Sequence, residues 1–233
     1  DLTHPDLNIV GGFNADGTPG GGPSVLGGNH GTAVAGNIGA IRNNGIGVFG
    51  TAPGVRILSV NMGNSYSNYA SAIDVAVTEG AKVINNSWGW HSAPSNLVED
   101  AIVNALADKV VVLFAAGNGP DRSPYVYNTI FPASLTATTD VISVGASSPT
   151  DEHKSASSSD GSHWWGSSYI GAGPDVVAPS PWNYTTDRQG VAGYNPDPWL
   201  GSLIDPGDAT SENYTPGFGG TSSATPMVAG IVA

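Results

Sequence analysis

Between Val55 and Ala146, short apolar segments alternate with amphipathic helical segments, and this alternation limits the possible folds more than any other feature. Residues 110–115 and 141–146 are almost continuous apolar runs, as expected for strands buried on both faces. The helical segments, 69–79 and 97–107, place apolar residues three or four positions apart. With further strands expected at 55–61 and 82–86, the pattern predicts a three-layer α/β/α fold with a mostly parallel central sheet.

The chain of 233 residues is long enough for one hydrophobic core, and we expect residues 1–233 to form a single domain. Residues 11–28 and 184–216 are rich in glycine and proline, and we expect them to be surface loops. In folds of this class, ligands bind at the carboxyl ends of the parallel strands. Segments 87–89 (SWG) and 117–118 (GN) follow two expected strands, so a site is expected there.

Near the end of the chain, residues 219–230 read GGTSSATPMVAG. Proline is tolerated in the first turn of a helix, so a helix is expected to begin near Ser222 or Ser223. The free N–H groups and the dipole at a helix N-terminus favour negative charge nearby. A serine at this position can be an N-cap or a nucleophile, and the segment alone leaves both interpretations open.

Three blocks of the chain resemble motifs of the subtilisin-like serine peptidases (the subtilase family), in the family's order. Residues 219–230 resemble its active-serine motif, residues 29–36 (NHGTAVAG) its active-histidine block, and residues 114–119 (FAAGNG) its oxyanion-asparagine block. The resemblance extends from His4 to Ala233. It implies a subtilisin-like fold and a serine endopeptidase that hydrolyses peptide bonds.

The resemblance implies a role for each of three side chains: Ser222 as the nucleophile, His30 as the general base, and Asn118 as an oxyanion donor together with the Ser222 backbone N–H. Ser223 is a competing nucleophile. Because adjacent helical residues point about 100° apart, only one of the two serines can face His30, and the family motif favours the first.

In the family, an aspartate orients the histidine, and the resemblance places that aspartate just upstream of the position matched by Asp1. Asp1 and Asp6 are candidate substitutes, but neither aligns with the catalytic acid. We therefore expect residues 1–233 to be a partial peptidase domain that lacks the upstream aspartate strand and the C-terminal end. Such a fragment is expected to be essentially inactive alone, whereas the parent protein is expected to be a protease.

By the same resemblance, Asp6 matches a family position that ligates a structural calcium ion, although it could equally be a solvated loop carboxylate. Asn43 or Asn44 could be a ligand beside it, since Ca²⁺ takes oxygen ligands. The adjoining residues 45–50 (GIGVFG) match the dinucleotide-binding pattern G-x-G-x-x-G. Nucleotide binding is not expected, because a helix is expected before this segment and none directly after it.

The resemblance also makes Ser87, Trp88 and Gly89 one wall of the pocket for the residue before the cleaved bond. The backbone of this segment would pair with an extended protein or peptide substrate. Trp88 could instead serve only in packing. Which substrate side chain is preferred is not readable from these residues.

Composition excludes several other classes. The net charge is −12, which argues against nucleic acid as a partner. The absence of cysteine excludes disulfides, zinc–thiolate sites and cysteine nucleophiles. No apolar run approaches the length of about 18 residues that suggests a membrane span. The family resemblance implies a secreted protein, and we expect a monomer.

The sequence argues against two other functions. An α/β-hydrolase esterase needs a G-x-S-x-G motif and a histidine after the serine, but no histidine follows Ser222. A catalytically inactive binding or scaffold protein on the same fold is the alternative, and the presence of His30, Asn118 and Ser222 argues against it.

Overall fold

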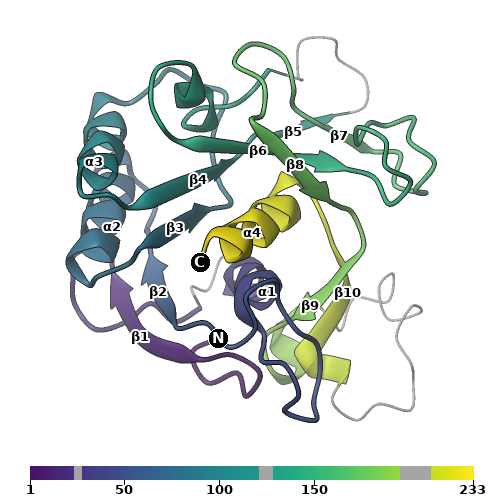
Figure 1. Cartoon of the computed structure of the whole chain (residues 1–233). Coiled ribbons are helices and arrows are strands. Elements are labelled where there is room, and N and C mark those ends of the chain that lie inside the picture. The colour runs from purple at the N-terminus through teal and green to yellow at the C-terminus, as the bar shows by residue number, and fades with distance from the viewer. Residues whose placement is uncertain (24–27, 121–127, 195–210) are drawn as a thin grey trace.

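The computed structural model describes residues 1–23, 28–120, 128–194 and 211–233 (Figure 1). The helices are α1 (Gly28–Gly39), α2 (Tyr66–Thr78), α3 (Asn96–Ala107) and α4 (Thr221–Val232), with short 3-10 helices η1 (Ala133–Ala137), η2 (Gly190–Ala192) and η4 (Ser211–Asn213). The strands are β1 (Ile9–Asn14), β2 (Ile57–Asn61), β3 (Val83–Asn86), β4 (Val111–Ala115), β5 (Asn118–Pro120), β6 (Ile142–Ser147), β7 (Trp165–Ser167), β8 (Val176–Pro179), β9 (Asn183–Thr186) and β10 (Tyr214–Phe218).

A parallel sheet in the order β3-β4-β6-β8 forms the centre of the fold. β1 and β2 make a separate parallel pair, and the pairs β5–β7 and β9–β10 are antiparallel. The central position of β4 explains its apolar sequence, because a strand covered on both faces has no solvated side. Val112, Leu113 and Phe114 are accordingly fully buried.

Helices cover both faces of the central sheet (Figure 1). On one side, α2 and α3 pack against each other, and their Ile73 and Ile102 join Val112 and Phe114 in one core cluster. On the other side, α1 lies beside α4, and Leu113 belongs to a second cluster with residues of α4. Because successive residues of a strand point to opposite faces, β4 contributes to both clusters. The predicted three-layer α/β/α fold with a mostly parallel sheet is confirmed.

Two expectations about loops were wrong in part. Residues 11–14 belong to β1, which pairs with β2 from Ile9 to Asn14, where a surface loop had been expected from residue 11 onward. Within 184–216, β9 pairs with β10, and Thr185, Thr186 and Tyr214 are buried. In both places a strand forms because a distant segment supplies its hydrogen-bonding partner. Residues 195–210 of this region lie outside the described residues.

In the part of the chain that the structure describes, no helix combines the length and the apolar character needed to cross a bilayer.

Candidate active site

Helix α4 begins at Thr221, directly after Gly220, whose φ of 79° lies in the left-handed region. A Cβ atom at position 220 would lie 2.9 Å from Asn118 Nδ2. Glycine therefore permits the turn and also leaves room for the amide of Asn118. Ser222 is the second residue of the helix, in the turn whose backbone N–H groups have no partner within the helix.

Pro226 lies inside α4, in its second turn, and not in the first turn as the sequence predicts. Proline has no N–H, so the carbonyl of Ser222, four residues earlier, loses its helical hydrogen bond. Ser87 Oγ donates to this carbonyl at 3.0 Å, and Ser222 Oγ donates to the Ser87 carbonyl at 3.2 Å. This reciprocal pair fixes Ser222 against the segment that follows β3.

The amide of Asn118 is oriented by helix α4. Asn118 Oδ1 accepts hydrogen bonds from the Thr221 backbone N–H at 2.8 Å and from Thr221 Oγ1 at 3.0 Å. Thr221 Oγ1 in turn accepts from the Gly117 N–H at 3.1 Å. Because the oxygen of the amide is held by these donors, its NH₂ group points away from them and is free to donate to a ligand.

His30 lies in the first turn of α1, and its ring packs edge-on against Phe218 with the ring centroids 5.5 Å apart. Burial lowers the pKa of His30 below its usual value, which favours the neutral imidazole near neutral pH. A neutral imidazole can accept a proton, as a general base must. Within the described residues, no side chain hydrogen-bonds to the ring of His30.

Ser223, the competing nucleophile, points into the protein and is completely buried. Its Oγ accepts hydrogen bonds from Asn37 Nδ2 at 3.0 Å and from Asn183 Nδ2 at 2.6 Å. Both amides come from segments that pack beside α4, so this serine ties α1 and β9 to the helix. The geometry therefore favours Ser222, and not Ser223, as the serine that can contact a substrate.

A cavity of about 400 Å³ is lined by all three side chains for which the sequence predicts a catalytic role. Its lining consists of His30, Asn118, Tyr194, Thr215, Gly217, Phe218, Gly219 and Ser222. Residues 30, 118 and 222 thus lie around one cavity. They are located at the starts of α1, β5 and α4, respectively.

The segment predicted as a substrate wall does not line this cavity. Ser87 is buried and bonded to Ser222, and a Cβ atom at Gly89 would lie 2.6 Å from Ile130. Trp88 stacks on Tyr69 at 5.2 Å within an aromatic cluster. The packing role considered for Trp88 is therefore present in the structure.

Asp6 is completely buried, and both of its carboxylate oxygens accept hydrogen bonds. Asn44 Nδ2 donates to one at 2.6 Å, and the Val48 N–H donates to the other at 3.1 Å. Asn43 is exposed, with its backbone in the left-handed region at φ 62°. Both asparagines lie at the surface, and the structure brings Asn44, by its hydrogen bond, together with Asp6.

Several residues of the site carried no signal in the sequence analysis. Thr221 orients Asn118, Asn37 and Asn183 hold Ser223, and Phe218 packs on His30. Threonine and asparagine are common at turns and helix ends, so only the long-range contacts separate these from the other polar residues of the chain.

Two histidines, His4 and His30, are expected to make the free energy of unfolding depend on pH. His4 Nδ1 accepts from the Asp6 N–H at 3.2 Å, so its proton lies on Nε2, which donates to the Asn213 carbonyl at 2.9 Å. Burial, as the first cause, lowers the pKa of His4, and burial also lowers the pKa of His30. Below the ordinary histidine pKa of about 6.5, the unfolded chain then binds more protons than the folded one.

We therefore expect the free energy of unfolding to be constant above about pH 7 with respect to these groups, and to fall as the pH decreases from about 6.5. Urea denaturation at pH 8, 7, 6 and 5 measures this slope, and His4→Gln should reduce it. The prediction is wrong if the free energy of unfolding of the unchanged protein falls no more between pH 8 and pH 5 than that of His4→Gln.

A serine at a helix N-terminus, a neutral histidine and an oriented amide beside one cavity of an α/β fold together fit a serine hydrolase. The particular family is given by sequence: the chain belongs to the subtilase family, whose model matches residues 2–233.

Alkaline elastase YaB from Bacillus sp. (strain YaB) is 36% identical over 236 residues, covering 99% of this chain and 50% of that relative. Subtilisin DY from Bacillus licheniformis is 35% identical over 237 residues, covering 99% of this chain and 71% of the relative. The chain spans about half the length of the first curated relatives it matches. The solved structure of the prenylagaramide maturation protease PagA aligns with a TM-score of 0.64 at 25% identity, over 100% of this chain and 70% of that one.

Proposed function

We propose that this chain carries the nucleophile, the general base and an oxyanion donor of a serine endopeptidase that acts on proteins or peptides. The observation that supports the proposal is the single cavity lined by Ser222, His30 and Asn118. Hydrolysis by this route needs a serine that loses its proton as it attacks, a neutral base that accepts the proton, and donors for the oxyanion.

In the proposed reaction, Ser222 Oγ leaves the Ser87 carbonyl and turns toward His30. The imidazole accepts the hydroxyl proton as Oγ attacks the substrate carbonyl carbon, and then delivers that proton to the leaving amine. The negative charge that develops on the carbonyl oxygen is stabilised by Asn118 Nδ2 and by the Ser222 backbone N–H at the start of α4. Water then cleaves the acyl-enzyme by the same steps.

An orienting carboxylate for His30 is not supplied by either candidate aspartate. Asp1 accepts hydrogen bonds from Thr3 and Gln189, and Asp6 is bonded to Asn44 and Val48. We propose that this carboxylate comes from outside residues 1–233. In subtilisin itself, loss of the triad aspartate lowers kcat by about 3 × 10⁴-fold, so residues 1–233 alone should be nearly inactive.

The decisive experiment is covalent labelling with a fluorophosphonate, which reacts with activated serines. The protein expressed from its complete reading frame should be labelled, Ser222→Ala should not, and Ser223→Ala, if folded, should still react. Absence of labelling in the folded protein would reject the proposal and support the inactive scaffold alternative. Labelling that survives Ser222→Ala and is lost in Ser223→Ala would reassign the nucleophile.

Asn118→Ala is expected to lower kcat by about 10²–10³-fold, the cost of one lost oxyanion donor, with little change in KM. Initial rates on a peptide substrate measure both constants. Asn104→Ala, at an exposed position of α3, is the matched control and should leave both constants unchanged. An unchanged kcat in Asn118→Ala would remove this residue from the proposed mechanism.

We also propose a structural Ca²⁺ site at Asp6 and Asn44. Its support is the buried carboxylate of Asp6, since carboxylate oxygens are ligands that suit calcium. Asn44 donates to that carboxylate through Nδ2 and accepts from the Ile46 N–H through Oδ1, so its amide would have to rotate to offer its oxygen to the ion. Asn43 is the weaker candidate: both asparagines are exposed, but Asn44 is the one that hydrogen-bonds to Asp6. Within the described residues, no cluster of three or more His, Asp or Glu side chains forms another metal site.

Ca²⁺ at about 100 times its Kd should raise the thermal midpoint by roughly 5–10 °C, because a ligand that binds only the folded state stabilises it. Scanning calorimetry with calcium and with a chelator measures this shift. Asp6→Asn should abolish it, whereas Asp16→Asn, in an exposed turn, should retain it. Equal midpoints with and without calcium would contradict the proposed site.

The remaining expectations rest on the family resemblance. We propose that the backbone of Ser87, Trp88 and Gly89 pairs with an extended substrate, that the protein is secreted, and that it is a monomer. Fractionation of the source culture and size-exclusion chromatography test the last two.

A further inference from the structure

The cavity at Ser222 and His30 has one wall that the proposed chemistry does not use. Two aromatic rings form it: Phe218, the last residue of β10, and Tyr194, which follows η2. Their ring centroids lie 6.4 Å apart with an angle of 31° between the ring planes. Phe218 packs in turn against His30, with 5.5 Å between the centroids. The two rings therefore make one surface that begins at His30, which we call the aromatic wall.

Tyr194 is carried by a segment after β9 that is held to other parts of the fold. Gln189 in this segment donates to Asp1 Oδ2 through its backbone N–H and through its side-chain Nε2, each at 3.2 Å. Directly before Tyr194, a Cβ atom at Gly193 would collide with the completely buried carboxylate of Asp187. Glycine thus lets the chain pass close to this carboxylate, and the contact helps to place the next residue at the cavity.

The position of the leaving group follows from the proposed reaction. The attacked carbon carries four substituents: Ser222 Oγ, the oxygen, the leaving nitrogen and the Cα atom of the residue before the cleaved bond. The oxygen faces Asn118, and the leaving nitrogen faces His30, because the imidazole delivers the proton to it. The substrate residue after the cleaved bond therefore begins beside His30, where the aromatic wall lies.

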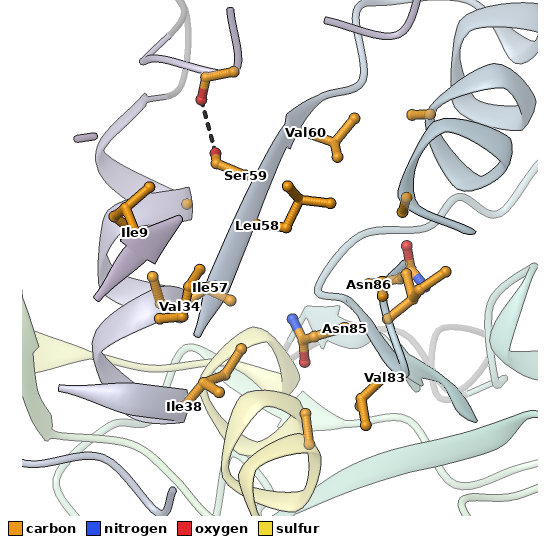
Figure 2. Close-up of a pocket in the computed structure, with 18 of the residues that line it drawn as sticks. Ile9, Val34, Ile38, Ile57, Leu58, Ser59, Val60, Val83, Asn85 and Asn86 are labelled. Carbon is orange, nitrogen blue, oxygen red and sulfur yellow. Dashed lines mark hydrogen bonds between the residues drawn. The ribbon is translucent and has the colours of Figure 1, made fainter. Parts of the chain in front are cut away.

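A larger cavity, of about 1030 Å³, also borders His30, but it cannot hold this bond. It lies between β2 and β3, where Figure 2 shows Ile57 and Val83 among its lining residues. Neither Ser222 nor Asn118 lines it. A peptide bond that contacts both of these residues lies in the smaller cavity, on the side of the aromatic wall.

The surroundings of the aromatic wall suit an apolar side chain. Among the described residues, no charged side chain lines the smaller cavity, and the lining next to the rings consists of Thr215, Gly217 and Gly219. Burial, as the first cause, and the nearby charge of Asp187 raise the pKa of Tyr194, so its phenol is uncharged at neutral pH. Uncharged aromatic rings bind apolar groups by burying their surface and by ring contacts.

We propose that Tyr194, together with Phe218, selects substrates with a large apolar side chain, such as phenylalanine, directly after the cleaved bond. This inference rests on the proposed function, since it concerns the leaving-group side of the same site. Tyr194 supplies contact area and takes no part in the proton transfer. A single apolar contact in a substrate pocket changes kcat/KM by about 10- to 200-fold, so the wall should favour phenylalanine over glycine by at least about tenfold.

The test compares three substrates that share one acyl part, using the protein expressed from its complete reading frame. Two are internally quenched peptides with phenylalanine or glycine directly after the cleaved bond, and the third is a methyl ester, whose leaving group is too short to contact the wall. Mass spectrometry verifies which bond is cleaved. Tyr194→Ala should lower kcat/KM for the phenylalanine peptide about tenfold more than for the glycine peptide or the ester. Tyr194→Phe keeps the ring and should keep the preference.

Tyr169→Ala is the matched control, because this tyrosine is 50% exposed and does not line the cavity, and it should keep the preference for phenylalanine. Cleavage of the ester without a preference between the two peptides would overturn this inference and leave the proposed function intact. Equal losses on all three substrates in Tyr194→Ala, or a preference that is lost in Tyr194→Phe, would also overturn it. A folded protein that cleaves none of the three and is not labelled at Ser222 would reject the proposed function as well.

Discussion

His30→Ala is expected to lower kcat by about 10⁶-fold in the protein expressed from its complete reading frame, and Ser222→Ala by a similar factor. The reason is that the nucleophile and the base act as one unit. Without the imidazole, the serine keeps its proton, and without the serine, the imidazole has no proton to accept. The double variant should therefore be no slower than either single variant.

Single-turnover kinetics on a chromogenic peptide measure these losses, and His91→Ala, at an exposed position, is the control that should leave kcat unchanged. Additive effects in the double variant would show that His30 and Ser222 act independently, which would contradict the proposed proton transfer. The residual activity of the variants should reflect binding and the oxyanion donors alone.

The second large effect concerns Lys154, whose ammonium group is completely buried beside Asp160. The two side chains have no exposed surface, and Nζ lies 3.4 Å from Asp160 Oδ2. The hydrogen-bond acceptors around Nζ are the carbonyl oxygens of Ser155 (2.6 Å), Ser162 (2.7 Å) and Trp165 (3.1 Å) and the hydroxyl of Ser158 (3.1 Å). Lys154 thus organises the polar segment between β6 and β7.

Lys154→Met is expected to lower the free energy of unfolding by about 3–5 kcal/mol, because it leaves a buried carboxylate and several carbonyl groups without their cation. Urea denaturation measures the change. The double variant Lys154→Met with Asp160→Asn should recover part of the loss, since it removes the uncompensated charge. Lys82→Met, at an exposed position, is the control, and a loss for Lys154→Met no larger than for this control would refute the prediction.

The order of the central strands and helices could be predicted from the sequence because each element carries its own local pattern. The run 110–115 is apolar throughout and forms β4, and the stripe in 97–107 corresponds to α3, each within one residue of its expected bounds. A strand that is covered on both faces needs apolar residues throughout, so its burial can be predicted from its own sequence.

The strands β1, β9 and β10 could not be predicted in the same way. β1 contains two glycines, β10 contains a proline and a glycine, and β9 lies in a chain region rich in both residues. What makes these segments strands is a partner elsewhere in the chain: β1 pairs with β2, and β9 pairs with β10. Strand pairing depends on neighbours as much as on the residues of the strand, so local composition predicted loops there.

The residues at the centre of the candidate site, Ser222, His30 and Asn118, were selected from three short blocks of sequence. The sequence by itself determined the residue types, their order and the α/β framework, because motifs and hydrophobic periodicity are local properties. Only the tertiary structure decided that Ser223 is hydrogen-bonded to two side-chain amides inside the protein. It also decided that Thr221 orients the amide of Asn118, and that Ser87 donates a hydrogen bond to the carbonyl left without a helical partner by Pro226. Side-chain direction and hydrogen-bond pairing depend here on contacts between residues 40 to 186 positions apart, and no local pattern encodes those contacts.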